Sequence, residues 1–209
     1  VMHRVLVTLR ADHGDLKDRH DPGATFGDLR EADLLREYLE HAMVRLVDHY
    51  GAALLPAGVD RASIEQQRER IEASGLAVAL YGWGPGGVIP AGARRPAGGH
   101  GPKWEVGYNA ANETINDWAL EWMAANPDQP GASGPLSVCV AAHCNAGGGD
   151  YGLVSCMERS GLGELAAGLL AARYRTIPEL RGDVRHVRTG PDEIGWMRNL
   201  DYLVRGAWS

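Results

Sequence analysis

The stretch VLVTLRADHGDLKDRHDPGATFGDLREADLLREYL, residues 5–39, decides the predicted fold of this chain. It opens with the β-branched and apolar run VLVTL, which predicts a buried strand. A loop dense in Asp, His and Gly is predicted next, at residues 10–27. Asp28 then stands three residues before Glu31, the spacing of a capping box, and leucines and alanines follow at helical spacing up to Gly51. The stretch therefore predicts a strand, a polar loop and an amphipathic helix.

The rest of the chain continues this alternation. Further strands are predicted at residues 52–55, 76–81, 136–142, 151–157 and 184–187, and helices at residues 61–74, 108–126 and 162–172. Seven glycines and four prolines between residues 84 and 103 predict a long loop in the middle of the chain. Alternating strands and helices favour an α/β fold. We expect a single domain over residues 1–209, with a mostly parallel central sheet of about six strands flanked by helices.

Composition narrows the function classes. The chain has 209 residues, 44% of them hydrophobic and 23% charged, as in ordinary globular domains. The formal net charge of -6 is the opposite of the basic surface that nucleic-acid binding needs, so no nucleic-acid partner is expected. No apolar run approaches the roughly 20 residues of a membrane span. His3 and Arg4 interrupt the first apolar segment, so no signal peptide is seen.

The three cysteines are Cys139, Cys144 and Cys156. They form no C-x-x-C pair and are odd in number, which is not the pattern of a disulfide framework or a zinc knuckle. We expect them to be reduced and half-buried. Cys144 directly follows His143, and adjacent residues on a strand point to opposite faces, so a Cys–His nucleophile is disfavoured.

Among the eight histidines, His13 and His143 each follow a predicted strand, at what we expect to be the same edge of a parallel sheet. Glu31 lies on the buried face of the predicted helix, in the turn nearest those strand ends. Two imidazoles and one carboxylate leave the fourth position of a tetrahedral zinc open for water, as in catalytic zinc sites. The alternative for Glu31 is the capping box itself. His41 and His49 lie on a charged part of the helix and are expected at the surface.

Three ordered motifs resemble those of a known family. The first is His13-Gly14 followed by the segment DPGA at residues 21–24, the second is Glu31 at the start of a long amphipathic helix, and the third is VAAHCNAGGGDYG, which contains His143 and Asn145. In this order they resemble the zinc-dependent N-acetylmuramoyl-L-alanine amidases of the type 3 fold, which cleave peptidoglycan. The resemblance extends over most of the chain, with residues 84–135 as an insertion.

The resemblance implies a zinc site and a reaction. It implies that His13, Glu31 and His143 bind Zn²⁺ and that Asn145 shapes the substrate site. The implied reaction is hydrolysis of the amide between N-acetylmuramic acid and L-Ala, in lysis or remodelling of the cell wall. The implied partner is peptidoglycan, and the implied place of action is the bacterial cell wall or periplasm. A phage lysin, a part of an injection apparatus or a chain shortened at its start would fit a sequence in which no signal peptide is seen.

The resemblance also implies a last strand with a glutamate that acts as the general base. No such segment occurs here, and we expect the chain to end just before that strand. Glu158, Glu164 and Glu193 are the nearest carboxylates in sequence and are expected at the surface. The catalytic base is therefore unassigned.

Three alternatives compete with the amidase. A zinc hydrolase of the metallocarboxypeptidase type needs the pair H-x-x-E, but Leu16 stands three residues after His13. A non-catalytic peptidoglycan-binding module with an amidase-like fold would need no metal. A nucleotide-binding domain rests only on glycine clusters, none of which forms G-x-G-x-x-G after a strand. Metal content distinguishes this metal-free module from the zinc amidase.

Overall fold

The computed structural model describes residues 3–16, 19–55, 59–83, 118–127, 134–144, 152–157, 161–178 and 184–189. The chain divides into two compact units, Val1–Ala146 and Gly147–Ser209, and each is described by itself. Across these described ranges, no helix has the length and apolar character that crossing a bilayer requires. The expectation of one domain over the whole chain stays a prediction.

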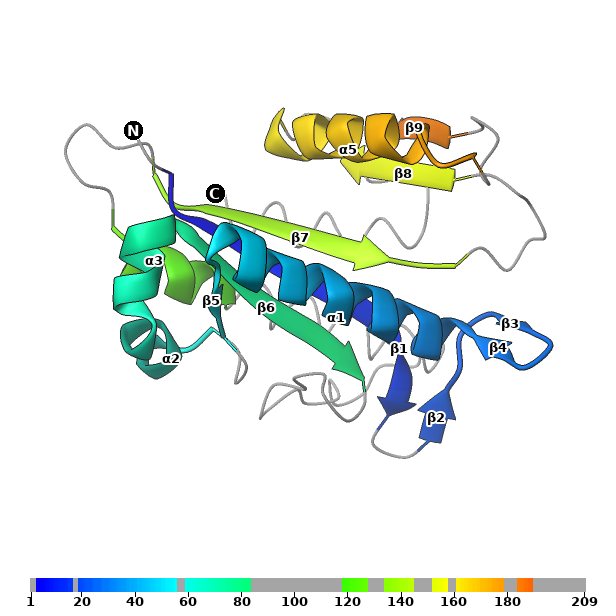
Figure 1. The fold of residues 1–209 in the computed structure, drawn as a ribbon, viewed down its shortest axis with the longest axis horizontal. Coiled ribbons are helices and arrows are strands. Elements are labelled where there is room, and N and C mark those ends of the chain that lie inside the picture. The colour runs from blue at the N-terminus through cyan, green and yellow to red at the C-terminus, as the bar shows by residue number, and fades with distance from the viewer. Residues whose placement is uncertain are drawn as a thin grey trace, which may run out of the picture. The chain divides into compact units, whose positions relative to one another are not determined.

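The first unit is built on a parallel sheet of four strands in the order β7-β1-β6-β5 (Figure 1). These strands are β1 (Val5–Leu16), β5 (Ala53–Leu54), β6 (Leu76–Trp83) and β7 (Leu136–Ala142). The short strand β2 (Arg19–Asp21) pairs antiparallel with the end of β1. The α/β class and the mostly parallel sheet are thus confirmed, with four parallel strands. A single sheet of about six strands stays a prediction.

The polar loop predicted at residues 10–27 is wrong, because most of this segment is strand. β1 continues past Leu9, shifts its register against β6 between Arg10 and Gly14, and then pairs with β2. Two further strands, β3 (Thr25–Phe26) and β4 (Leu29–Arg30), form a hairpin. Neighbouring strands satisfy the backbone here, so pairing overrides the low strand propensity of Asp, Gly and His.

Helix α1 (Glu31–Tyr50) lies along one face of the sheet and begins at the carboxyl ends of β6 and β7 (Figure 1). Its predicted stop is confirmed, since Gly51 adopts a left-handed φ of 68° and donates its N–H to the Leu46 carbonyl. The predicted capping box is wrong. Asp28 instead belongs to the two-residue turn of the β3–β4 hairpin, and the N-cap residue Arg30 makes no side-chain cap.

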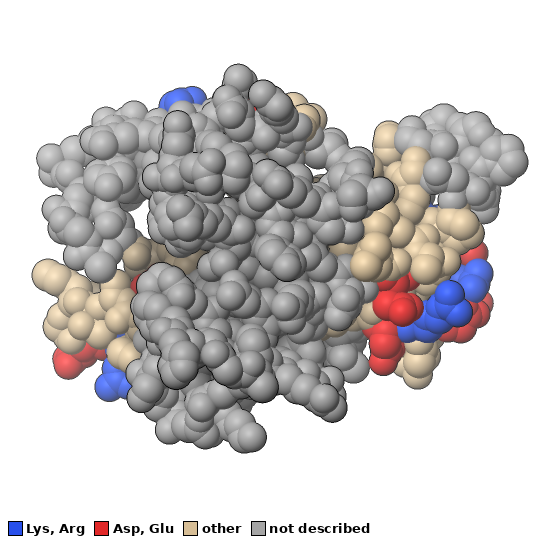
Figure 2. All heavy atoms as spheres, turned by 180° about the vertical axis from the view of Figure 1, so that it is seen from behind, with Lys and Arg blue, Asp and Glu red and all other residues tan. Residues whose placement is uncertain are grey.

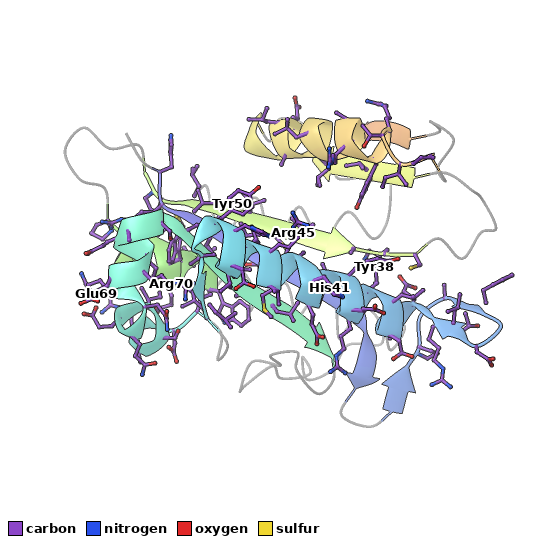
Figure 3. The ribbon with its side chains drawn as sticks, viewed as in Figure 1. Tyr38, His41, Arg45, Tyr50, Glu69 and Arg70 are labelled. Carbon is purple, nitrogen blue, oxygen red and sulfur yellow. The ribbon has the colours of Figure 1, made fainter. Side chains whose placement is uncertain are left out.

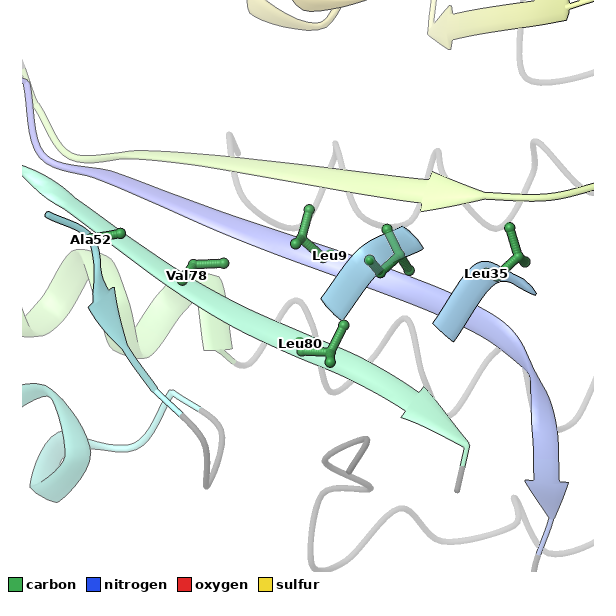
Figure 4. Close-up of a cluster of buried hydrophobic side chains, with 6 residues drawn as sticks. Leu9, Leu35, Ala52, Val78 and Leu80 are labelled. Carbon is green, nitrogen blue, oxygen red and sulfur yellow. The ribbon is translucent and has the colours of Figure 1, made fainter. Parts of the chain in front are cut away.

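The helix is held to the sheet by an apolar cluster (Figure 4). Its buried members are Leu9 of β1, Leu35 and Leu39 of α1, Ala52, and Val78 and Leu80 of β6. Burial of one such leucine side chain contributes roughly 1.5–3 kcal/mol. Because Leu35 and Leu39 are one helical turn apart, they fix the rotation of α1. That rotation also turns Glu31, one turn before Leu35, toward the interior.

The helix predicted at residues 61–74 is two helices, α2 (Arg61–Gln66) and α3 (Arg68–Ser74), separated at Gln67. Nothing in the local sequence explains this break. The start of α2 is capped by Asp60, whose Oδ1 accepts the Ser63 N–H at 2.7 Å. Figure 2 shows acidic and basic side chains interleaved on the flank of the molecule that α2 and α3 form.

Arg70 links α3 to the end of α1 (Figure 3). Its guanidinium donates to the carbonyls of Gly51 at 3.2 Å and Val47 at 3.3 Å. Carbonyls in the last turn of a helix have no partner inside the helix, and the negative end of the helix dipole favours a cation. Arg70 therefore stabilises the C-terminal end of α1.

The helix that follows the long central segment is described for residues 118–125. Trp118 and Trp122, four residues apart on this helix, are both buried and belong to the core. The side chain of Asn126 donates to the Trp122 carbonyl at 2.9 Å, which closes the helix end. The long loop predicted at residues 84–103 lies outside the described residues.

The second unit contains the parallel strands β8 (Gly152–Met157) and β9 (Val184–Thr189), which pair with each other, and helix α5 (Gly161–Tyr174). The predicted strands and helix in this region are thereby confirmed. Ala167 and Ala171 of α5 pack with Val154 and Cys156 of β8. These small residues let the helix approach the strand pair closely.

Candidate functional site

Two of the three predicted metal ligands lie side by side in the first unit. His143 directly follows β7, and Glu31 is the first residue of α1. The His143 Nδ1 atom is 3.5 Å from the Glu31 Oε1 atom. The Glu31 side chain is 4% exposed, whereas the His143 side chain is 34% exposed. The pair thus has a buried, fixed carboxylate and an imidazole that solvent and ligands can reach.

The carboxylate of Glu31 is held by backbone amides from two other segments. The Ala24 N–H donates to Oε2 at 2.8 Å, and the Cys144 N–H donates to Oε1 at 2.7 Å. An ionised carboxylate accepts hydrogen bonds in about four directions, so two backbone donors fit it without conflict. The capping role considered for Glu31 is wrong, because its side chain accepts from neighbouring segments instead of reaching back within the helix.

The backbone brings His13 to the same edge of the sheet. Ala11 of β1 is in register with Ala142, the last residue of β7. His13 is therefore two residues beyond this pair on β1, and His143 is one residue beyond it after β7. The expectation that His13 follows its strand is wrong, since β1 extends to Leu16. The side chain of His13 lies outside the described residues.

The separation of Glu31 and His143 suits a shared metal ion. An N–H···O hydrogen bond is usually about 2.7–3.2 Å long, shorter than the 3.5 Å seen here. Two donor atoms about 2.0–2.2 Å from a tetrahedral zinc lie about 3.3–3.6 Å apart. Where side chains are described, no group of three or more His, Cys, Asp or Glu gathers as a metal site. The third ligand of the predicted set is His13.

Cys144 contributes its backbone to the site, while its side chain packs against the apolar cluster below α1. Burial raises the pKa of the Cys144 thiol, and the negative charge of Glu31 raises it further. The thiol is therefore protonated at neutral pH and a poor nucleophile. This agrees with the expectation from sequence. None of the three cysteines forms a disulfide; Cys139 and Cys144 are half-buried, whereas Cys156 is buried rather than half-buried.

The sequence did not predict that the backbone amides of Ala24 and Cys144 hold the Glu31 carboxylate. Backbone donors carry no residue signature, so only indirect signals existed. Gly23, which precedes Ala24 in the DPGA segment, adopts a φ of 66° that L side chains rarely reach. A glycine after a proline in a short connection predicts such a turn, although not its partner.

The remaining candidates lie away from this site or outside the described residues. His41 and His49 are exposed, as expected, and Figure 3 shows His41 beside Tyr38 and Arg45 on the exposed side of α1. Glu164 lies in the first turn of α5 and is partly exposed. Asn145, Glu158 and Glu193 lie outside the described residues.

Comparisons with protein-family models, with curated proteins and with solved structures gave no match for this chain.

Proposed function

We propose that this protein is a zinc-dependent hydrolase that cleaves the amide between N-acetylmuramic acid and L-Ala in peptidoglycan. The observation that carries the proposal is the 3.5 Å approach of the Glu31 carboxylate to the His143 imidazole at the carboxyl end of β7. The carboxyl edge of a parallel sheet is where open α/β folds place their sites. The order of the DPGA, Glu31 and HCNA motifs supports the substrate class.

Glu31 and His143 would hold the metal, together with His13 from the neighbouring strand β1. Glu31 is suited to be a fixed metal ligand, because its side chain is buried and two backbone amides orient its oxygens. Second-sphere hydrogen bonds of this kind set the orientation of ligating side chains in metal sites. The partly exposed His143 would lie on the side from which substrate enters.

Zinc bound by these residues would supply a Lewis acid that polarises the scissile carbonyl and lowers the pKa of a water molecule toward about 7. The N–H groups of Ala24 and Cys144 would orient both Glu31 oxygens toward fixed directions in the site. Asn145, which follows Cys144, would contact the substrate.

The proposal extends to architecture and location. We propose that all 209 residues form one amidase-like catalytic domain with a central sheet of about six strands. Residues 84–135 would be an insertion. Action on peptidoglycan would place the protein at the bacterial cell wall or in the periplasm, with a phage or an injection apparatus among the candidate delivery routes.

Digestion of purified peptidoglycan tests the proposal. The wild-type protein loaded with zinc should release stem peptides with a free L-Ala amino group, and a chelator should stop the release. His143→Ala should abolish it, whereas His49→Ala, which changes an exposed histidine of α1, should not. No release by the zinc-loaded protein, under conditions in which a known amidase releases peptides, would exclude the enzyme.

A second candidate is a non-catalytic peptidoglycan-binding module. It is favoured by one observation: the Glu31 carboxylate joins residue 24, α1 and the end of β7 through backbone amides, and such a junction stabilises a fold without metal. This candidate predicts that the protein sediments with peptidoglycan in the presence of chelator and releases no peptide. Zinc-dependent release would exclude it.

A further inference from the structure

The segment Pro22–Ala24 is tied to the start of α1 by three hydrogen bonds. The Ala32 N–H donates to the Pro22 carbonyl at 3.1 Å, and the Glu31 N–H donates to the Ala24 carbonyl at 2.9 Å. In return, the Ala24 N–H donates to the Glu31 carboxylate at 2.8 Å. Ala24 and Glu31 therefore hold each other reciprocally, and the first two N–H groups of the helix gain partners that the helix itself does not provide.

Gly23 sets the direction of the Ala24 N–H. The peptide plane that carries this N–H lies between Gly23 and Ala24, and its direction depends on the backbone angles of Gly23. The φ of Gly23 is 66°, in the left-handed region that favours glycine. A residue with a Cβ would shift this angle toward negative φ and turn the N–H away from the carboxylate.

The opposite oxygen of the carboxylate is held by the Cys144 N–H and lies nearest His143. Donors on both oxygens prevent the carboxylate from rotating about its last side-chain bond. If the Ala24 donor were lost, Glu31 could turn, and the 3.5 Å separation from the imidazole would no longer be fixed. The left-handed turn at Gly23 thus bears on the geometry of the proposed ligand pair.

We propose that Gly23 is a positioning residue for the metal site, acting through the Ala24 amide on the Glu31 carboxylate. This inference rests on the proposed zinc chemistry of Glu31 and His143. Loss of an outer-sphere partner of a metal ligand typically weakens metal affinity 10- to 100-fold. Gly23→Ala should therefore weaken zinc binding by a factor in that range, in protein that remains folded.

Gly51 provides a matched control. It lies just beyond the other end of α1, and its φ of 68° is nearly that of Gly23. A Cβ at Gly51 would meet the Ser74 Cβ at 3.6 Å, an ordinary contact, so backbone strain is the main effect of Gly51→Ala. Both substitutions should lower the melting temperature, but only Gly23→Ala should change zinc affinity.

The experiment is a zinc titration of the metal-free full-length protein in competition with a chromophoric chelator, well below the melting temperature of each variant. We expect a 10- to 100-fold rise in the zinc Kd for Gly23→Ala and a change of less than twofold for Gly51→Ala. Gly23→Asn should restore wild-type affinity, because asparagine tolerates left-handed φ. If Gly23→Ala fails to fold, restored affinity in Gly23→Asn supports the inference, and weakened affinity overturns it.

The outcomes separate this inference from the proposed function. A zinc Kd of folded Gly23→Ala within twofold of wild type overturns the positioning role and leaves the zinc hydrolase in place. Equal weakening in Gly23→Ala and Gly51→Ala also overturns it, since strain alone would then account for the loss. A wild-type protein that binds no zinc overturns both.

Discussion

Replacement of Glu31 by glutamine tests whether the carboxylate works as a double acceptor. Glu31→Gln keeps the size and shape of the side chain but replaces one oxygen by an NH₂ group. Both carboxylate oxygens face backbone donors, Ala24 N–H on Oε2 and Cys144 N–H on Oε1. Either orientation of the amide therefore sets a donor against a donor, and flipping the amide does not relieve the conflict.

The size of the effect follows from the two hydrogen bonds. Glutamine keeps one of them as a neutral bond and loses the other, which leaves one donor without its acceptor beside a side chain that is 4% exposed. A lost hydrogen bond to a charged group costs about 1.5–3 kcal/mol, and removal of a buried charge offsets part of this. We expect metal-free Glu31→Gln to lose about 1–3 kcal/mol of unfolding free energy.

Urea unfolding followed by circular dichroism measures this change. Glu40→Gln is the matched control, since Glu40 lies on the same helix and pairs with Arg36 at 3.0 Å with both side chains largely exposed. A surface pair of this kind contributes about 0.3–0.5 kcal/mol. If Glu31→Gln were no more destabilising than Glu40→Gln, the double-acceptor role of the carboxylate would be refuted.

Four further predictions follow from the same structure. Zinc at 100 times its Kd should stabilise the protein by about 2.7 kcal/mol, seen by calorimetry as a rise of about 5–10 °C in Tm that a chelator reverses; an unchanged Tm would contradict the metal site. The hydrogen bond from the Ser63 N–H lowers the pKa of Asp60 in the folded protein. The Asp60 cap therefore stabilises α2 fully above the ordinary pKa of aspartate, and this stabilisation is lost as the pH falls through the lowered pKa of Asp60. Asp60→Ala should therefore cost about 0.5–2 kcal/mol at pH 7 but less at a pH below the lowered pKa of Asp60, and an equal cost at both pH values would exclude this cap. Because burial raises the pKa of Cys144, iodoacetamide should modify this thiol more slowly at pH 8 than it modifies free cysteine. Cys144→Ser keeps the backbone N–H that binds Glu31 and should therefore retain zinc affinity. Leu39→Ala should cost about 2–5 kcal/mol in urea unfolding, against less than about 0.5 kcal/mol for the exposed Val44→Ala, and similar costs would contradict the packing of α1.

Most elements of the fold were predictable because their signals are local. The run from Leu136 to Ala142 is apolar and ends at a polar pair, and the strand has those bounds. The helix stop at Gly51 was equally clear, since a glycine readily adopts the left-handed φ that is found there. The extension of β1 was not predictable, because pairing with β2 and β6 supplies partners that the sequence of that segment does not reveal.

The candidate site was likewise predictable only in part. Strand ends and helix periodicity were enough to place Glu31 and His143 together, and their atoms lie 3.5 Å apart. The hydrogen bonds that orient Glu31 come from the amides of Ala24 and Cys144, and backbone donors leave no mark in residue type. The predicted cap at Asp28 failed because the hairpin turn uses that residue. Tertiary contacts thus decide what the carboxylate does.

The most direct test of the account is the position of zinc in crystals of the full-length protein, located by anomalous scattering at the zinc edge. We predict one peak within about 2.0–2.2 Å of a Glu31 carboxylate oxygen and of imidazole nitrogens of His13 and His143. A peak only at exposed histidines such as His41 or His49, with Glu31 bound to its two amides alone, would contradict the metal site and with it the proposed hydrolase.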